Sequence, residues 1–272
     1  MKKFGKFAIP YLVWMGILVV IPLAIMVGLA FLKTDGVSLK GAQFTFENFS
    51  RLFDHAIIVG LSNSLKFSII TTIACLLLGY PVAYIISKAN IKNRFLVMAI
   101  LILPMWSNML LRTTALRNIF SPNNIITDLL GIEGINIIGT ELAVILGMIS
   151  TYLPFMILPI YTVLEKIEPS LLEASNDLGA NNFRTFWKVV FPISLKGVAS
   201  GVILVLLPSA TGFAIPRILG EGNYVLIGSI IENSFDNMNY NFGSLLSLII
   251  IIIIMGALLI ISKIDKEGET LL

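Results

Sequence analysis

The chain has 272 residues, of which 57% are hydrophobic and 13% are charged, and its formal net charge is +3 at pH 7. Ordinary soluble domains carry about 25% charged residues, so this composition excludes a typical water-soluble domain and indicates a membrane protein. Cys75 is the single cysteine, which excludes a disulfide framework and a cysteine metal site within one chain.

Six stretches are long and apolar enough to cross a hydrocarbon core of roughly 30 Å as helices, which takes about 20 residues each. They are too long and too continuously apolar for the alternating strands of a membrane barrel. The sequence therefore predicts an all-α membrane protein with six transmembrane helices, a single domain over residues 1–272 with its core at about 57–262. In chain order the six stretches lie near residues 8–32, 57–87, 95–114, 141–164, 195–219 and 242–262.

The first stretch follows a basic start, as the apolar part of a secretory signal peptide would. It is long, contains Pro22 and lacks a clear small-residue cleavage site. We therefore expect it to remain as the first span.

Lys and Arg gather in the short connections on the cytoplasmic side of membrane proteins, so their distribution predicts the orientation. Six spans would place 12 of the 19 on one side: Lys2, Lys3, Lys6, Lys88, Lys92, Arg94, Lys166, Arg184, Lys188, Lys196, Lys263 and Lys266. The other 7 would be Lys33, Lys40, Arg51, Lys66, Arg112, Arg117 and Arg217. Both termini and the connection between the fourth and fifth spans are therefore expected in the cytoplasm.

The outer side would carry nine carboxylates against those seven basic groups, so a slightly acidic outer face is expected. This weakly favours a cationic solute. The nine residues are Asp35, Glu47, Asp54, Asp128, Glu133, Glu141, Glu221, Glu232 and Asp236.

The connection between the fourth and fifth spans contains the polar segment EASNDLGANNFRTFWKVVFPIS at 173–194. Ser170 is expected to cap a short helix over about 171–178, with Glu173 completing a capping box. Gly179 is expected to end this helix in the left-handed conformation. Such a rigid projecting helix could dock into a groove on a soluble partner, or the segment could be a solvated amphipathic loop.

A second short helix is expected after this turn, capped by Asn181 or Asn182 and interrupted by Pro192 where the chain reaches the membrane. Its apolar residues recur every three or four positions and should pack against the bundle. They are Phe183, Phe186, Trp187, Val190 and Phe191.

The spacing in this connection resembles the EAA loop of ATP-binding-cassette importer permeases, which reads Glu-Ala-Ala, three residues, Gly, nine residues and Ile-x-Leu-Pro. The chain has Ser175, Val189 and Phe191 as conservative departures from that pattern. The resemblance implies that the first helix is a coupling helix, which inserts into a cleft of an ATPase subunit. The residues that it assigns to this contact are Glu173, Ala174, Ser175, Leu178, Gly179 and Ala180.

Four stretches are similar to the first-type permease of spermidine/putrescine importers: LGYPVAYIIS (78–87), LPMWSNMLLRT (103–113), the segment 152–180 and GVILVLLPSATGFAIPRILG (201–220). This resemblance implies a permease subunit in a bacterial plasma membrane. Its partners would be two copies of an ATPase that binds ATP and Mg, a second related permease and an extracellular or periplasmic polyamine-binding protein. The chain itself would bind no cofactor and no nucleic acid. Glu221 departs from the family pattern, because many relatives carry two adjacent glycines after the leucine.

A polyamine is a flexible polycation, and aromatic faces along its path would offer modest cation–π contacts. Trp106, Tyr152 and Phe213 are the candidates, with membrane anchoring or core packing as the alternative for each. Prolines interrupt the third, fourth and fifth stretches, as in broken helices that line transport pathways: Pro104, Pro154, Pro159, Pro208 and Pro216.

Other classes of function have weaker support. The spans hold no paired acids, no zinc motif and no nucleophile with a base, which argues against an enzyme. No phosphate-binding loop is present, and His55 lacks companion metal ligands. A permease for another small solute and a secondary transporter remain the alternatives.

Overall fold

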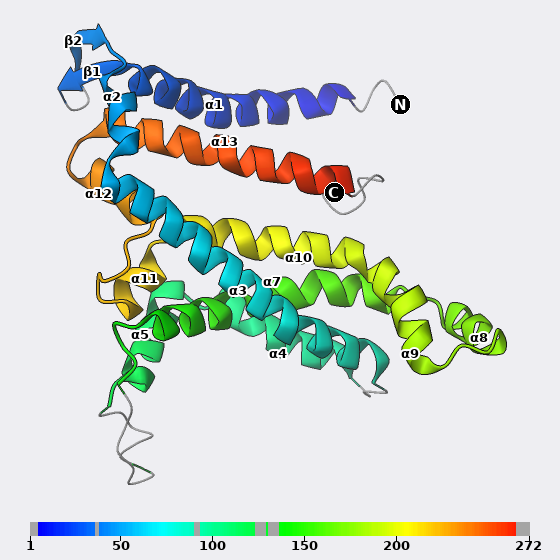
Figure 1. The fold of residues 1–272 in the computed structure, drawn as a ribbon. Coiled ribbons are helices and arrows are strands. Elements are labelled where there is room, and N and C mark those ends of the chain that lie inside the picture. The colour runs from blue at the N-terminus through cyan, green and yellow to red at the C-terminus, as the bar shows by residue number, and fades with distance from the viewer. Residues whose placement is uncertain (1–4, 36–37, 90–92, 123–128, 130–135, 265–272) are drawn as a thin grey trace.

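The structure is a computed structural model that describes residues 5–35, 38–89, 93–122, 129 and 136–264, and it is a bundle of long helices (Figure 1). Among the described residues, five apolar helical runs are long enough to cross a membrane. Four are single helices: α1 (Gly5–Ala30), α3 (His55–Lys88), α7 (Glu141–Glu165) and α13 (Tyr240–Ile264). The fifth run, Asn182–Thr211, contains α10 (Phe191–Thr211).

The continuous span predicted at 95–114 is instead two helices, which give a sixth crossing only if the bent pair is counted as one span. The helices α4 (Arg94–Trp106) and α5 (Met109–Phe120) pass the same test only as a pair, bent by 94° at the break between them. Pro104 lies in the last turn of α4, and Asn108 caps α5 by accepting hydrogen bonds from the amides of the next turn. Because Asn108 starts a new helix, the chain changes direction here.

The helices α3, α7 and α10 form the centre of the bundle. The interface between α7 and α10 is close because α10 carries glycines there. A Cβ atom on Gly197 would lie 2.8 Å from the carbonyl oxygen of Pro159 and 2.9 Å from the Cα of Ile160. Small residues that let backbones approach are typical of membrane helix interfaces. By contrast, α1 packs mainly on α13 and exposes most of its apolar side chains.

The two ends of the bundle differ (Figure 1). The start of α1, the end of α13 and a projecting helix, α8 (Pro169–Asp177), lie at one end, which we call the projecting end. At the other, the hairpin end, β1 (Leu32–Asp35) pairs antiparallel with β2 (Ser38–Phe44). These two strands were not predicted from the sequence.

Four short helices also lie at the hairpin end: α2 (Glu47–Ser50), η1 (Arg51–Phe53), α11 (Ala214–Leu219) and α12 (Ile227–Asp236). The fifth span, predicted at 195–219, ends earlier than expected. The helix α10 stops at Thr211, and the residues from 214 belong to α11. Pro208 lies in the last turn of α10, where Gly212 adopts an extended conformation.

Gly197→Ala should destabilise the bundle, because the added methyl group would meet backbone atoms of α7 that cannot move aside independently. Overpacking of this kind costs about 1–3 kcal/mol. The change should appear as a lower apparent melting temperature of the detergent-solubilised protein. Gly256→Ala is the matched control, because nothing lies within 4 Å of the position of its Cβ atom. Equal melting temperatures for both variants would contradict the close α7–α10 contact.

Candidate functional site

The projecting helix α8 starts differently from the prediction. Glu168 is its N-cap residue, Pro169 occupies the first turn, and Glu168 makes no side-chain capping bond. Ser170 lies inside the helix, and its hydroxyl group donates to the Glu168 carboxylate at 3.2 Å. The predicted capping box at Ser170 and Glu173 is therefore wrong. Pro169 displaces it because the fixed φ of proline suits the first helical position, where no amide hydrogen is needed.

The end of α8 agrees with the prediction. Gly179 has a φ of +78°, in the left-handed region. The amide of Gly179 donates to the carbonyl of Asn176, and the amide of Ala180 donates to that of Ser175. These two bonds form a Schellman motif, which satisfies carbonyls that the helix end leaves free. The chain thereby reverses direction in a tight, defined turn.

The second helix begins at once, with α9 at Asn182–Thr185. Asn181 caps it by accepting a hydrogen bond from the amide of Arg184 at 2.8 Å. The helix does not stop at Pro192 as predicted. It widens into a π turn, η2 (Phe186–Val190), and continues directly into α10. Pro192 then falls in the first turn of the α-helical segment, where proline is tolerated.

Aromatic rings hold this second helix against α3. The ring of Phe186 packs edge-on against Tyr84, with centroids 5.3 Å apart, and against Tyr80 at 6.0 Å. The hydroxyl groups of Tyr80 and Ser194 are hydrogen-bonded at 2.8 Å, which joins α3 to α10. Phe183 is 72% exposed and contributes little to this contact. The anchors Tyr80 and Tyr84 were not predicted, although their spacing of four places both on one face of a helix.

Six residues were predicted to contact a partner, and the structure places all six on α8 or in the turn that follows it. Glu173, Ala174, Leu178 and Gly179 are exposed, and the Leu178 side chain is 90% exposed. Ser175 and Ala180 are half-buried, and the Ser175 hydroxyl is 2.9 Å from that of Thr185. The contact between Ser175 and Thr185 thus fixes α8 to the next helix, while Glu173 and Leu178 form an exposed acidic and apolar surface.

The three aromatic candidates do not gather around one cavity among the residues that the structure describes. Trp106 is the last residue of α4 and is 89% exposed. Tyr152 is buried in α7 and its hydroxyl group donates to the carbonyl oxygen of Pro208 at 3.2 Å. A Cβ atom on Gly212 would lie 3.2 Å from that hydroxyl, so Tyr152 and Phe213 both lie where α10 ends.

An open cavity of about 600 Å³ lies at the hairpin end, between α5 and the segment around α11. Glu221, the departure from the family pattern, lines it with a φ of +49° and an ion pair to Arg117 at 2.9 Å. Three more carboxylates of the predicted outer set are also in ion pairs: Glu47 with Lys33, Glu141 with Lys66 and Glu232 with Arg217.

The described part of the chain holds no group of three or more His, Cys, Asp or Glu residues that could bind a metal ion. The described residues form a bundle of apolar helices from which one polar helix, α8, projects. The family model described as "Binding-protein-dependent transport system inner membrane component" matches residues 6–264. The chain belongs to this family.

Close relatives bear names from the same class of protein. The chain is 37% identical to a spermidine/putrescine transport system permease protein, PotB, of Haemophilus influenzae over 91% of this chain and 89% of that protein. It is 35% identical to PotB of Escherichia coli, with 91% and 92% covered. These relatives are permeases, and this chain is likewise a membrane-embedded permease subunit rather than an enzyme.

Solved structures share the fold. A bacterial ABC transporter that imports the acidic polysaccharide alginate has a chain with a TM-score of 0.78 and 16% identity, covering 98% of this chain and 96% of that one. The MetNI methionine ABC transporter, in inward-facing conformations, gives a TM-score of 0.61 and 17% identity, with 82% and 98% covered. The predicted class of fold, an importer-type bundle of membrane helices, is confirmed.

Phe186→Ala should loosen the second polar helix from α3, because it removes both edge-on contacts to the tyrosines. Aromatic pairs contribute about 0.5–1.5 kcal/mol each beyond their buried area, so a loss of about 1–3 kcal/mol is expected. Limited proteolysis should then cut the 177–190 segment faster. Phe183→Ala is the control in the same helix, and equal rates in the two variants would argue against this anchoring.

Proposed function

We propose that the chain is a permease subunit of an ABC importer for polyamines, forming the membrane pathway together with a second related permease. Its identity of 35–37% to spermidine/putrescine permeases over about nine-tenths of the chain is the observation that carries the proposal. Two copies of a partner ATPase would bind ATP and Mg, and an extracellular or periplasmic binding protein would deliver the polyamine. An importer of another small solute is the alternative, since the methionine transporter shares the fold.

We place the projecting end in the cytoplasm of a bacterial cell, with both termini. The start of α1 and the end of α13 lie at the same end of the bundle, as Figure 1 shows, and the excess of Lys and Arg in the connections at this end supports the assignment to the cytoplasm. The hairpin end would then face the binding protein. Residues 1–272 would form one permease domain.

In this orientation α8 acts as the coupling helix. Glu173, Ala174, Leu178 and Gly179 present an exposed surface to the ATPase, while Ser175 is tied to Thr185 in the next helix. Closure of the two ATPases on ATP would move the helices of the two permeases together. The bundle would then open outward to the loaded binding protein, and hydrolysis of ATP would return it to the inward-open state.

For the pathway we propose Trp106, Tyr152 and Phe213 as aromatic contacts for the ammonium groups and methylene spacers of the polyamine. All three lie beside a helix end or break: Trp106 at the α4–α5 bend, and the other two where α10 ends. A cation over an aromatic face gains about 0.5–2 kcal/mol, which is weak enough for release.

The test is ATP-dependent uptake of labelled spermidine by vesicles that contain this chain and its co-purifying partners. Wild-type vesicles should accumulate spermidine, and unlabelled putrescine should reduce the signal if both are substrates. Gly179→Val should abolish uptake although the protein inserts normally. A β-branched residue at a φ of +78° is strained, and an L-residue there costs about 1–2 kcal/mol, so the turn after α8 should distort.

Gly41→Val is the matched control for this variant, since Gly41 also has a positive φ with nothing within 4 Å but lies at the hairpin end. Normal uptake by Gly179→Val would refute the coupling role of α8. Co-purification of an ATPase without any spermidine uptake would refute the polyamine assignment alone. Failure to recover an ATPase would favour a secondary transporter.

Alanine variants of Trp106, Tyr152 and Phe213 test the pathway in the same vesicles. We expect uptake to fall roughly 2- to 30-fold per variant, the loss of one cation–π contact. ATPase activity stimulated by the binding protein should stay near the wild-type level. Unchanged uptake in all three variants would remove these residues from the pathway.

A further inference from the structure

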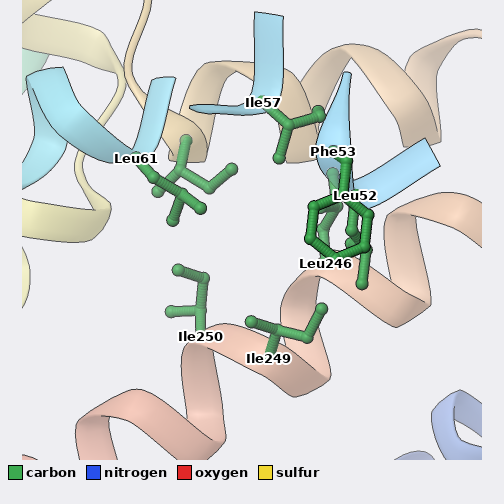
Figure 2. Close-up of a pocket in the computed structure, with 8 residues that line it drawn as sticks. Leu52, Phe53, Ile57, Leu61, Leu246, Ile249 and Ile250 are labelled. Atoms are coloured by element: carbon green, nitrogen blue, oxygen red, sulfur yellow. The ribbon is translucent and has the colours of Figure 1, made fainter. Parts of the chain in front are cut away.

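An apolar groove runs between α3 and α13 at the hairpin end of the bundle. Two adjoining cavities form it, of about 190 Å³ and about 250 Å³, which share the lining residues Leu61, Ile227 and Ile250. Figure 2 shows Ile57 and Leu61 of α3 facing Ile249 and Ile250 of α13 across the first cavity. Two of its walls belong to helices that are long and apolar enough to cross a membrane, and Ile227 of α12 completes the lining of both cavities.

The groove offers almost no hydrogen-bonding group to an occupant. Ser64 and Thr211 are its polar lining residues. The Ser64 hydroxyl accepts a hydrogen bond from the amide of Ile227 at 2.9 Å, and the Thr211 hydroxyl donates to the carbonyl of Leu207 at 3.0 Å. An apolar cavity of about 150 Å³ in a protein stays dry and takes up apolar molecules instead. A hydrocarbon chain is therefore the kind of occupant that this groove suits.

The dimensions favour a single lipid chain over a helix. Along α13 the lining runs from Leu246 to Ile254, about 12 Å at 1.5 Å per residue, close to the roughly 15 Å thickness of one hydrocarbon leaflet. A helix is about 10–12 Å across, so a narrower acyl chain is the occupant that requires the least widening of the groove.

A cation stands at the hairpin end of the groove, where a lipid headgroup would lie. The guanidinium carbon of Arg51 lies over the Phe242 ring, 4.1 Å from its centroid, and Phe242 is one helical turn from the groove residue Leu246. Within the described part of the chain, no group accepts a hydrogen bond or forms an ion pair with this guanidinium. The nearby Glu47 is bound to Lys33 at 2.8 Å, and this contact, with a smaller contribution from the charge of Arg51, lowers the pKa of the Glu47 carboxyl group.

We propose that this groove binds one acyl chain of a phospholipid, with the phosphate group held by Arg51. The contact with the buried Phe242 ring restrains the position of the guanidinium and leaves its N–H donors without a hydrogen-bond acceptor among the described residues. A guanidinium presents such donors in a fork that matches phosphate oxygens. The lipid would fill the space that separates α13 from α3, and it would join the α1–α13 pair to the centre of the bundle.

The test is native mass spectrometry of the assembled importer, released from nanodiscs that contain equal amounts of phosphatidylglycerol and phosphatidylcholine. The wild-type complex should retain a phospholipid, enriched in phosphatidylglycerol, that the Leu61→Trp complex lacks. Leu61 lines both cavities, so a tryptophan there fills the groove. Leu77→Trp is the control, because Leu77 lies on the same helix and is 69% exposed.

Arg51→Gln removes the charge without filling the groove, and it should reduce retention of phosphatidylglycerol about fivefold, the effect of one basic group near a membrane surface. Retention equal to wild type in both Leu61→Trp and Arg51→Gln would overturn the proposal. It would also be overturned if cysteines placed at Leu61 and Ile250 cross-linked to the second permease, because the groove would then be a subunit interface.

Discussion

The close contact between α7 and α10 is the constraint on which the rest of the bundle depends. In a membrane, helices gain little by burying apolar surface from lipid, so their association relies on close packing and polar contacts. Gly197 and Gly201 bring the backbone of α10 against Pro159, Ile160 and Met156 of α7. The third central helix, α3, approaches α7 in a similar way at Gly79, where a Cβ atom would lie 3.2 Å from Met156.

This centre also determines where the polar helices can stand. Because α10 is continuous with α9 through the π turn, the position of α9 follows that of α10. Phe186, inserted between Tyr80 and Tyr84, adds a contact with α3, and Leu172 of α8 packs at the edge of the core. A helix as short as α8 would be marginal alone in water, and these contacts together with the Schellman turn hold it in place.

Hydropathy was sufficient to locate the long spans, because crossing a membrane imposes length and apolarity directly on the sequence. The turn at Gly179 was also predictable, since a glycine just after a helix commonly adopts the left-handed conformation that ends it.

The bend at Asn108 was missed because the apolar character of 95–114 continues through it, and hydropathy does not register a capping side chain. The expected interruption at Pro192 does not occur, since the π turn before it places this proline in the first turn of α10. The six candidate coupling residues lie together because they are adjacent in sequence, whereas the aromatic candidates depend on packing that no local pattern encodes.

The same contacts indicate which helices would move as one unit and which would not. A displacement of α8 and α9 would reach α10 through the continuous backbone and α3 through Phe186, so these elements are expected to move together with α7. The α1–α13 pair is joined to this unit mainly through α12 and borders α3 across an apolar groove. An apolar groove is crossed by few hydrogen bonds, so sliding of α13 past α3 costs less free energy than separating α7 from α10 or α3, which it meets at glycines. We therefore expect that rocking of the central helices takes place against α1 and α13, with the groove as the yielding surface.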